Sequence, residues 1–185
     1  YHNLVKIVSR GYTEGFYYKP RVDKEVLRQF SQGIICTSAC MAGEVPTLIR
    51  RDNYQGALEA AREYEQIFGK DNFFIEIQDH RLEQEKFLNG QLIRLARELE
   101  IPLVAANDSH YGEQDDAFSH DVLMCVQLAK SVNDEHRMEF PNNEFYVKTV
   151  SEMRDASVEK LQEVPGITQT VAEEIHRFFH EERSI

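Results

Sequence analysis

The sequence predicts an α/β fold in which short parallel strands alternate with helices. Three stretches, residues 34–38, 72–78 and 101–107, are apolar and rich in β-branched or aromatic residues, as strands are. Helical patterns separate them, and connections of that length join parallel strands through crossovers. These strands are apolar throughout, which favours a sheet covered on both faces.

Helices are expected between and beside these strands, because apolar residues recur there every three or four positions. In the longest pattern, Phe87, Leu92, Leu95 and Leu99 are expected on the apolar side. The predicted helices cover residues 22–30, 53–69, 81–99 and 115–130.

The composition indicates a soluble domain and argues against a broad nucleic-acid-binding surface. The chain has 185 residues and a net charge of −11, and such a surface is normally basic. No apolar run approaches the ~20 residues of a membrane helix, and no signal-peptide pattern is found, so a cytoplasmic location is expected. Because the chain starts at Tyr1 within a helical pattern, we expect it to be a piece of a longer protein.

The three cysteines show no CxxC pairing, which favours reduced thiols. Cys36 and Cys125 sit in apolar surroundings and are expected in the core. Cys40 differs, because it follows the first predicted strand directly.

Ligating side chains follow all three predicted strands. Ligands of α/β folds gather at the carboxyl ends of strands, and there the sequence places Cys40, Asp79, His80, Asp108 and His110. A thiolate, a carboxylate and an imidazole suit zinc, manganese or iron. The alternative is that Asp108 belongs to a turn or caps the next helix, and that His110 is a loop histidine.

Six blocks of sequence carry a family resemblance: "GFYYKPRVDKEVL", "TSACMAGEVP", "FFIEIQDH", "PLVAANDSHY", "DAFSHDVLMCVQ" and "EFYVKTVSEM". Together, residues 1–153 resemble the C-terminal part of the PHP (polymerase and histidinol phosphatase) domain, in the version found in bacterial DNA polymerase III alpha subunits. The resemblance implies part of a distorted barrel of seven parallel strands with helices outside.

The resemblance also implies a metal site. Cys40, Asp108 and His110 match family ligands for divalent metal, either zinc or manganese/magnesium, and His80 matches a family histidine near the site. The remaining ligands belong upstream of Tyr1, so the site in this segment is expected to be incomplete. No catalytic residue is assigned.

As a function, the resemblance implies a segment of a replicative polymerase that copies DNA from deoxynucleoside triphosphates with other replicase subunits. Its PHP domain is either a metal-dependent 3′–5′ exonuclease or phosphoesterase, or a structural support. The polymerase carboxylates belong to a later domain. Two rivals stay open: a stand-alone PHP-family phosphoesterase, and a non-catalytic scaffold or DNA-repair fragment.

Two further features bear on nucleic acid. Tyr17 and Tyr18, with Lys19 and Arg21, are suited to stacking on a nucleic acid, or they form a packed aromatic pair with a solvated basic flank. The tail, residues 154–185, resembles the helix-hairpin-helix of the excinuclease C protein, in which Gly166 matches a glycine that lets backbone N–H groups meet a DNA phosphate.

Overall fold

The computed structural model describes residues 1–149, which form two compact units. Unit 1 comprises Tyr1–Ile77 and Gln91–Val104, and unit 2 comprises Gln78–Gly90 and the described residues from Ala105 onward. Cys40 therefore belongs to unit 1, whereas Asp108 and His110 belong to unit 2. The predicted tail and its Gly166 lie outside the described residues.

The sheet is three-stranded in the order β1-β2-β3, formed by β1 (Cys36–Thr37), β2 (Phe73–Gln78) and β3 (Leu103–Ala106). β1 runs parallel to β2, with Cys36 opposite Phe73. The backbone N–H of Ile75 in β2 donates to the carbonyl of Pro102, just before β3. This arrangement confirms the predicted α/β class with parallel pairing. The described residues show these three strands and not the whole barrel that the resemblance implies.

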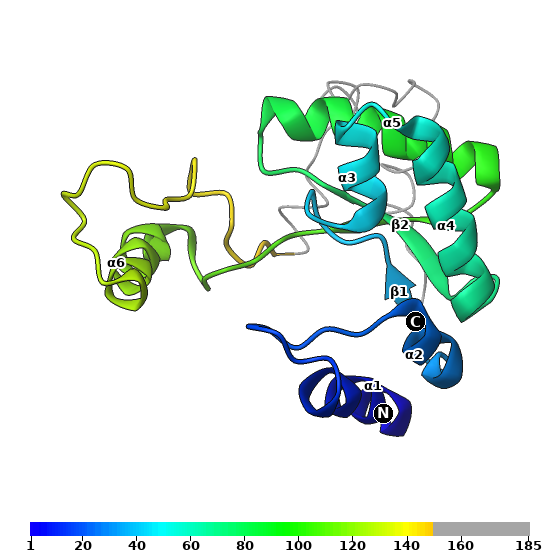
Figure 1. Ribbon diagram of the computed structural model, residues 1–185. Coiled ribbons are helices and arrows are strands. Elements are labelled where there is room, and N and C mark those ends of the chain that lie inside the picture. The colour runs from blue at the N-terminus through cyan, green and yellow to red at the C-terminus, as the bar shows by residue number, and fades with distance from the viewer. Residues whose placement is uncertain (150–185) are drawn as a thin grey trace, which may run out of the picture. The chain divides into compact units, whose positions relative to one another are not determined.

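Two helices, α3 (Glu44–Arg50) and α4 (Tyr54–Phe68), lie side by side in unit 1 (Figure 1). The predicted helix over residues 53–69 is confirmed, since Asn53 caps it through Gly56 N–H and Gly69 ends it at a φ of 89°. Its buried face includes Leu58, whose burial stabilises the fold by about 1.5–3 kcal/mol. α3 is not among the helices that the sequence predicts.

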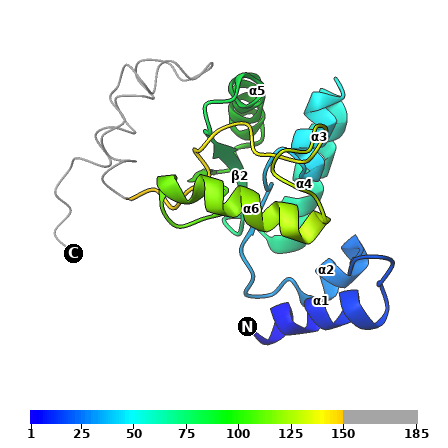
Figure 2. The same cartoon turned by 90° about the vertical axis from the view of Figure 1, so that its left-hand side faces the viewer.

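The first two helices, α1 (His2–Thr13) and α2 (Lys24–Phe30), pack together (Figure 2). Asp23 begins α2 by accepting a hydrogen bond from Val26 N–H at 2.9 Å. The Lys24 ammonium then bridges Glu44 of α3 at 2.9 Å and Glu63 of α4 at 2.7 Å. This ion-pair network ties α2 to the α3–α4 pair.

Two expectations about apolar faces are wrong. In β3, Leu103 is 39% exposed and the last two residues of the strand are exposed as well, so residues 1–149 do not cover this strand on both faces. In α5 (Glu83–Leu99), Phe87 is 60% exposed, because the buried stripe runs through Leu88, Leu92 and Leu95 instead. Phe87 precedes that stripe by one residue, which turns it about 100° away around the helix axis.

Unit 2 contains the segment Gln78–Gly90 with the start of α5, the loop after β3, a further helix and a returning segment. The helix α6 (Ala117–Leu128) follows a short 3₁₀ turn, η1 (Gln114–Asp116), and ends at Ala129 with a φ of 53°. Residues 142–148, here called the strap, return to the loop after β3, where Val147 N–H donates to the Tyr111 carbonyl at 3.1 Å. Among the residues that the structure describes, no helix is long and apolar enough to cross a membrane.

Candidate functional site

The loop after β3 brings two of the predicted ligands together. Asp108 Oδ1 and His110 Nε2 lie 3.3 Å apart, and both side chains are partly exposed. Residues i and i+2 of an extended chain point to the same side, so the sequence spacing alone predicts that these side chains meet. They do meet, but for a different reason. Ser109 N–H donates to the Asn107 carbonyl at 2.9 Å, so a tight turn places the two side chains on one side.

The Asp108 carboxylate does not cap the next helix. Glu113 begins η1, where its side chain and that of Asp116 form a reciprocal capping box. The alternative that Asp108 caps the next helix is thereby excluded. Asp108 does belong to a turn, as the other alternative states, but its carboxylate lies beside His110.

His80 lies beneath this loop and has no exposed surface. Its Nδ1 is 2.7 Å from Glu85 Oε1, and its backbone N–H donates to Glu85 Oε2 at 2.6 Å. On the other side of the ring, Nε2 accepts a hydrogen bond from the Asp108 backbone N–H at 3.2 Å. His80 thus connects a buried carboxylate to the backbone of a predicted ligand.

The strap holds the same loop from its other side. The Phe145 carbonyl accepts hydrogen bonds from His110 N–H at 2.7 Å and from Tyr111 N–H at 3.3 Å. The Asn107 amide donates to the Tyr146 carbonyl at 2.6 Å, and Lys148 donates to Asn107 Oδ1 at 3.2 Å. The loop that carries Asp108 and His110 is therefore fixed by hydrogen bonds on both sides.

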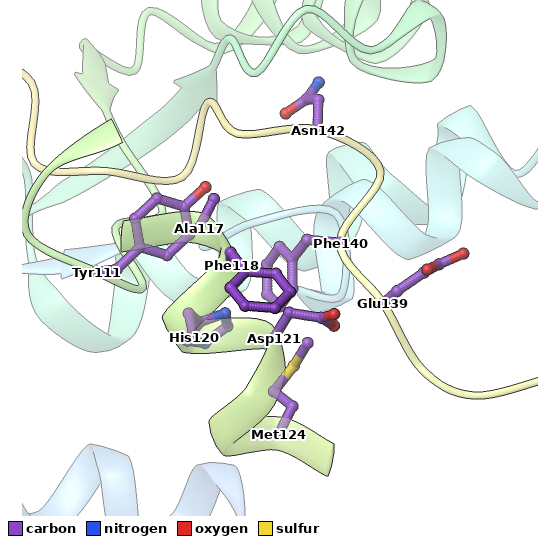
Figure 3. Close-up of a pocket in the computed structure, with 9 residues that line it drawn as sticks. All are labelled: Tyr111, Ala117, Phe118, His120, Asp121, Met124, Glu139, Phe140 and Asn142. Atoms are coloured by element: carbon purple, nitrogen blue, oxygen red, sulfur yellow. The ribbon is translucent and has the colours of Figure 1, made fainter. Parts of the chain in front are cut away.

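Aromatic rings surround the His110 imidazole. Its ring centroid lies 4.6 Å from that of Phe140 and 5.7 Å from that of His120. His120 therefore packs in a ring cluster, and it also lines a cavity of about 240 Å³ (Figure 3). The Tyr111 hydroxyl is buried with no hydrogen-bond partner within the described part of the chain. The cavity is lined by Tyr111, Ala117, Phe118, His120, Asp121, Met124, Glu139, Phe140 and Asn142.

Cys40 occupies the loop directly after β1 in unit 1 and is half-buried. Gly43 N–H donates to the Cys40 carbonyl at 2.8 Å and closes this loop. A Cβ at Gly43 would lie 2.2 Å from the Ser38 carbonyl oxygen, so only glycine fits there. Within β1, burial raises the pKa of the Cys36 thiol to about 11, which leaves this thiol protonated near neutral pH.

The remaining predicted strand-end residue, Asp79, has a structural partner, because its side chain accepts a hydrogen bond from Arg81 N–H at 2.8 Å. Within β2, Glu76 accepts a hydrogen bond from the Thr37 hydroxyl at 2.6 Å. Across residues 1–149, no three His, Cys, Asp or Glu side chains gather as metal ligands would. The roles of Cys40, Asp108 and His110 as ligands therefore stay predictions.

Tyr17 and Tyr18 are both exposed, with ring centroids 4.6 Å apart and edge-to-face. The Arg21 guanidinium lies 4.9 Å from the Tyr17 ring centroid, in a cation–π contact. The aromatic pair is thus packed against itself at the surface, and both interpretations of these residues stay open.

Sequence reasoning missed Glu85 and the strap. Glu85 resembles an ordinary acidic residue in the first turn of a helix, yet it is only 3% exposed. No local pattern marks it, because its partner His80 lies before the helix begins. The strap lies partly in the block "EFYVKTVSEM", which carries the family resemblance, but no local pattern indicates that its carbonyls bind the loop.

The sequence comparisons agree with one another. Residues 1–80 match the PHP domain family, and residues 145–185 match the helix-hairpin-helix motif. Relatives named DNA polymerase III subunit alpha include those of Treponema pallidum (47% identical over 153 residues, 83% of this chain) and Thermus aquaticus (46% over 154 residues, 83% of this chain). The chain spans about 13% and 12% of these relatives.

A third relative bears on the tail. The DNA polymerase III subunit alpha of Saccharopolyspora erythraea is 41% identical over 179 residues, covering 95% of this chain and 15% of the relative. Such a span cannot fit within residues 1–153. Similarity to a polymerase subunit therefore continues into the predicted tail.

Proposed function

We propose that this chain is a segment of a bacterial replicative DNA polymerase. It matches the PHP domain and the helix-hairpin-helix motif, and it is homologous to DNA polymerase III alpha subunits. The parent protein extends DNA from deoxynucleoside triphosphates in the cytoplasm, together with other replicase subunits. The homology over 83–95% of the chain carries this proposal.

We further propose that the PHP part, a section of a seven-stranded barrel, holds a divalent metal through Cys40, Asp108 and His110. The support is the separation of 3.3 Å between Asp108 Oδ1 and His110 Nε2. Two donor atoms that each lie about 2.0–2.1 Å from one tetrahedral zinc are themselves about 3.3 Å apart. Both side chains are also partly exposed, so a cation can reach them.

A bound Zn²⁺ or Mn²⁺ supplies a positive charge that polarises a phosphodiester and favours its hydrolysis at a 3′ end. The protein's own part is to orient the ligands, since hydrogen bonds to the backbone N–H groups of Asp108 and His110 fix the loop.

In the tail, we propose that the hairpin around Gly166 contacts the DNA backbone. Its support is the match of residues 145–185 to the helix-hairpin-helix motif. A fluorescence anisotropy titration with a DNA duplex at low salt tests this role, and Gly166→Val should weaken binding without changing the fold of residues 1–149.

The metal proposal is tested with the full-length protein that contains this segment. Asp108→Ala and His110→Ala should lower its zinc or manganese content and its 3′–5′ exonuclease rate together. Asp115→Ala and His136→Ala are matched controls, because both residues are exposed in the same unit. Unchanged metal content in Asp108→Ala and His110→Ala would refute the ligand assignment. Coding sequence that stops downstream, without polymerase domains, would refute the polymerase assignment.

A further inference from the structure

Every polar atom of His80 has a partner, although the residue has no exposed surface. Its backbone N–H and its Nδ1 both meet Glu85, at 2.6 Å and 2.7 Å. Its carbonyl accepts a hydrogen bond from the Asn142 amide at 2.7 Å. The ring stacks on Phe145, with centroids 4.3 Å apart and planes within 4° of parallel. Because both the backbone and the ring of His80 are held by neighbouring residues, the ring has one orientation.

The partners define which ring nitrogen carries the hydrogen. Nε2 faces the Asp108 backbone N–H at 3.2 Å and can only accept there. Nδ1 therefore carries the hydrogen and donates it to Glu85, whose carboxylate accepts. With its lone pair already engaged, Nε2 has none left for a metal.

The bond from Asp108 to His80 is one half of a clamp. The other half is the Phe145 carbonyl, which accepts from His110 N–H at 2.7 Å while the Phe145 ring stacks on His80. Because one histidine and the residue stacked on it hold the amides of both predicted ligands, the spacing of these ligands depends on His80.

We propose that His80, oriented by Glu85, is a positioning residue that fixes the backbone of Asp108 and is not itself a metal ligand. Its value for metal binding rests on the function proposed above, whereas the clamp itself consists of hydrogen bonds among the protein's own residues. The resemblance implies only that a histidine lies near the site at this position, and the clamp gives this histidine a role other than metal ligation.

The first test needs no variant. Nitrogen NMR of the 185-residue chain should show the His80 hydrogen on Nδ1 and a bare, hydrogen-bonded Nε2. Addition of Zn²⁺ alone should leave the Nε2 signal in place. A hydrogen on Nε2, or a Zn²⁺-induced shift of Nε2 to a metal-bound value, would overturn the proposal.

The second test compares two substitutions by amide hydrogen exchange. His80→Gln keeps an acceptor near the Nε2 position, and His80→Phe keeps only the ring that stacks on Phe145. Exchange at the Asp108 amide should accelerate about threefold to tenfold in His80→Phe and much less in His80→Gln, as the loss of one net hydrogen bond implies. Equal exchange in wild type and His80→Phe would overturn the clamp.

A third measurement separates this proposal from the proposed function. In the full-length protein, Zn²⁺ affinity should fall about 10–100-fold in His80→Phe, the usual cost of losing a group that orients a ligand. If wild type does not bind Zn²⁺, the proposed metal-binding function is refuted. The clamp is then judged by the hydrogen-exchange result alone. Unchanged affinity in His80→Phe would refute the positioning role alone.

Discussion

Removal of the Glu85 carboxylate should destabilise unit 2 more than removal of the other acidic side chain in the first turn of α5. Glu85 is 3% exposed and accepts hydrogen bonds from the His80 backbone N–H and from His80 Nδ1. In Glu85→Ala both donors stay buried without a partner. Each such donor costs about 1–3 kcal/mol, so the free energy of unfolding should fall by roughly 2–6 kcal/mol.

A matched control lies two residues away. Glu83 is in the same first turn, but its side chain is 86% exposed and pairs only with Lys86 among the ion pairs of the described residues. Glu83→Ala should therefore cost at most about 0.5 kcal/mol. Glu85→Gln should fall between the two, because one amide oxygen replaces one acceptor while the amide hydrogens oppose the second donor.

The assay is native-state hydrogen exchange of unit 2 amides in urea, which reports each unit separately where a single melting temperature would not. The Asp108 and His110 amides should lose protection in Glu85→Ala. Equal free energies of unfolding for Glu85→Ala and Glu83→Ala would show that the buried carboxylate does not support His80.

Three further predictions concern unit 1. Gly43→Ala should destabilise the Cys40 loop by about 1–3 kcal/mol, since its Cβ would lie 2.2 Å from the Ser38 carbonyl oxygen; unchanged urea unfolding would contradict this. Burial raises the Cys36 pKa from 9.0 to about 11, so the contribution of the protonated thiol to stability is complete below pH 9 and lost as pH rises through 11. Alkylation of Cys36 at pH 8 should be roughly 100-fold slower than alkylation of an unburied thiol. Equal alkylation rates would refute the burial. Lys24 and Arg28 lower the Glu63 pKa, so the contribution of these ion pairs to stability is present above the ordinary pKa of 4.5 and lost as pH falls below that value. Carbon NMR should show a higher titration midpoint for Glu63 in Lys24→Met. An unchanged midpoint would exclude the ion pair with Lys24.

The elements that sequence predicted best are those whose signals are local. Asn53 and Gly69 mark both ends of α4, and the structure uses both as the cap and the stop. α3 escaped prediction because it begins after Gly43, which offers no side chain to cap it, and because Pro46 lies in its first turn. The equally short α2 begins at Asp23, whose side chain caps it. The exposure of β3 could not be predicted either. An apolar composition indicates that a segment forms a strand, but it does not indicate which elements cover that strand.

For the candidate site, the sequence predicted which residues to examine, and their role as ligands stays a prediction. Asp108 and His110 do lie 3.3 Å apart, because of a tight turn that the sequence did not indicate. Glu85 and Phe145 act through His80, across separations in sequence that no periodicity links to the loop. Long-range contacts of this kind emerge only when the chain is folded.

The central claim is that the Cys40 thiolate, the Asp108 carboxylate and the His110 imidazole bind one metal centre. The most direct test is the optical spectrum of the Co²⁺-loaded full-length protein, because thiolate ligation gives a charge-transfer absorption that oxygen and nitrogen ligands do not. We expect this absorption in wild type and in Cys125→Ser, and its loss in Cys40→Ser. Its absence from wild type, or its persistence in Cys40→Ser, would contradict the claim.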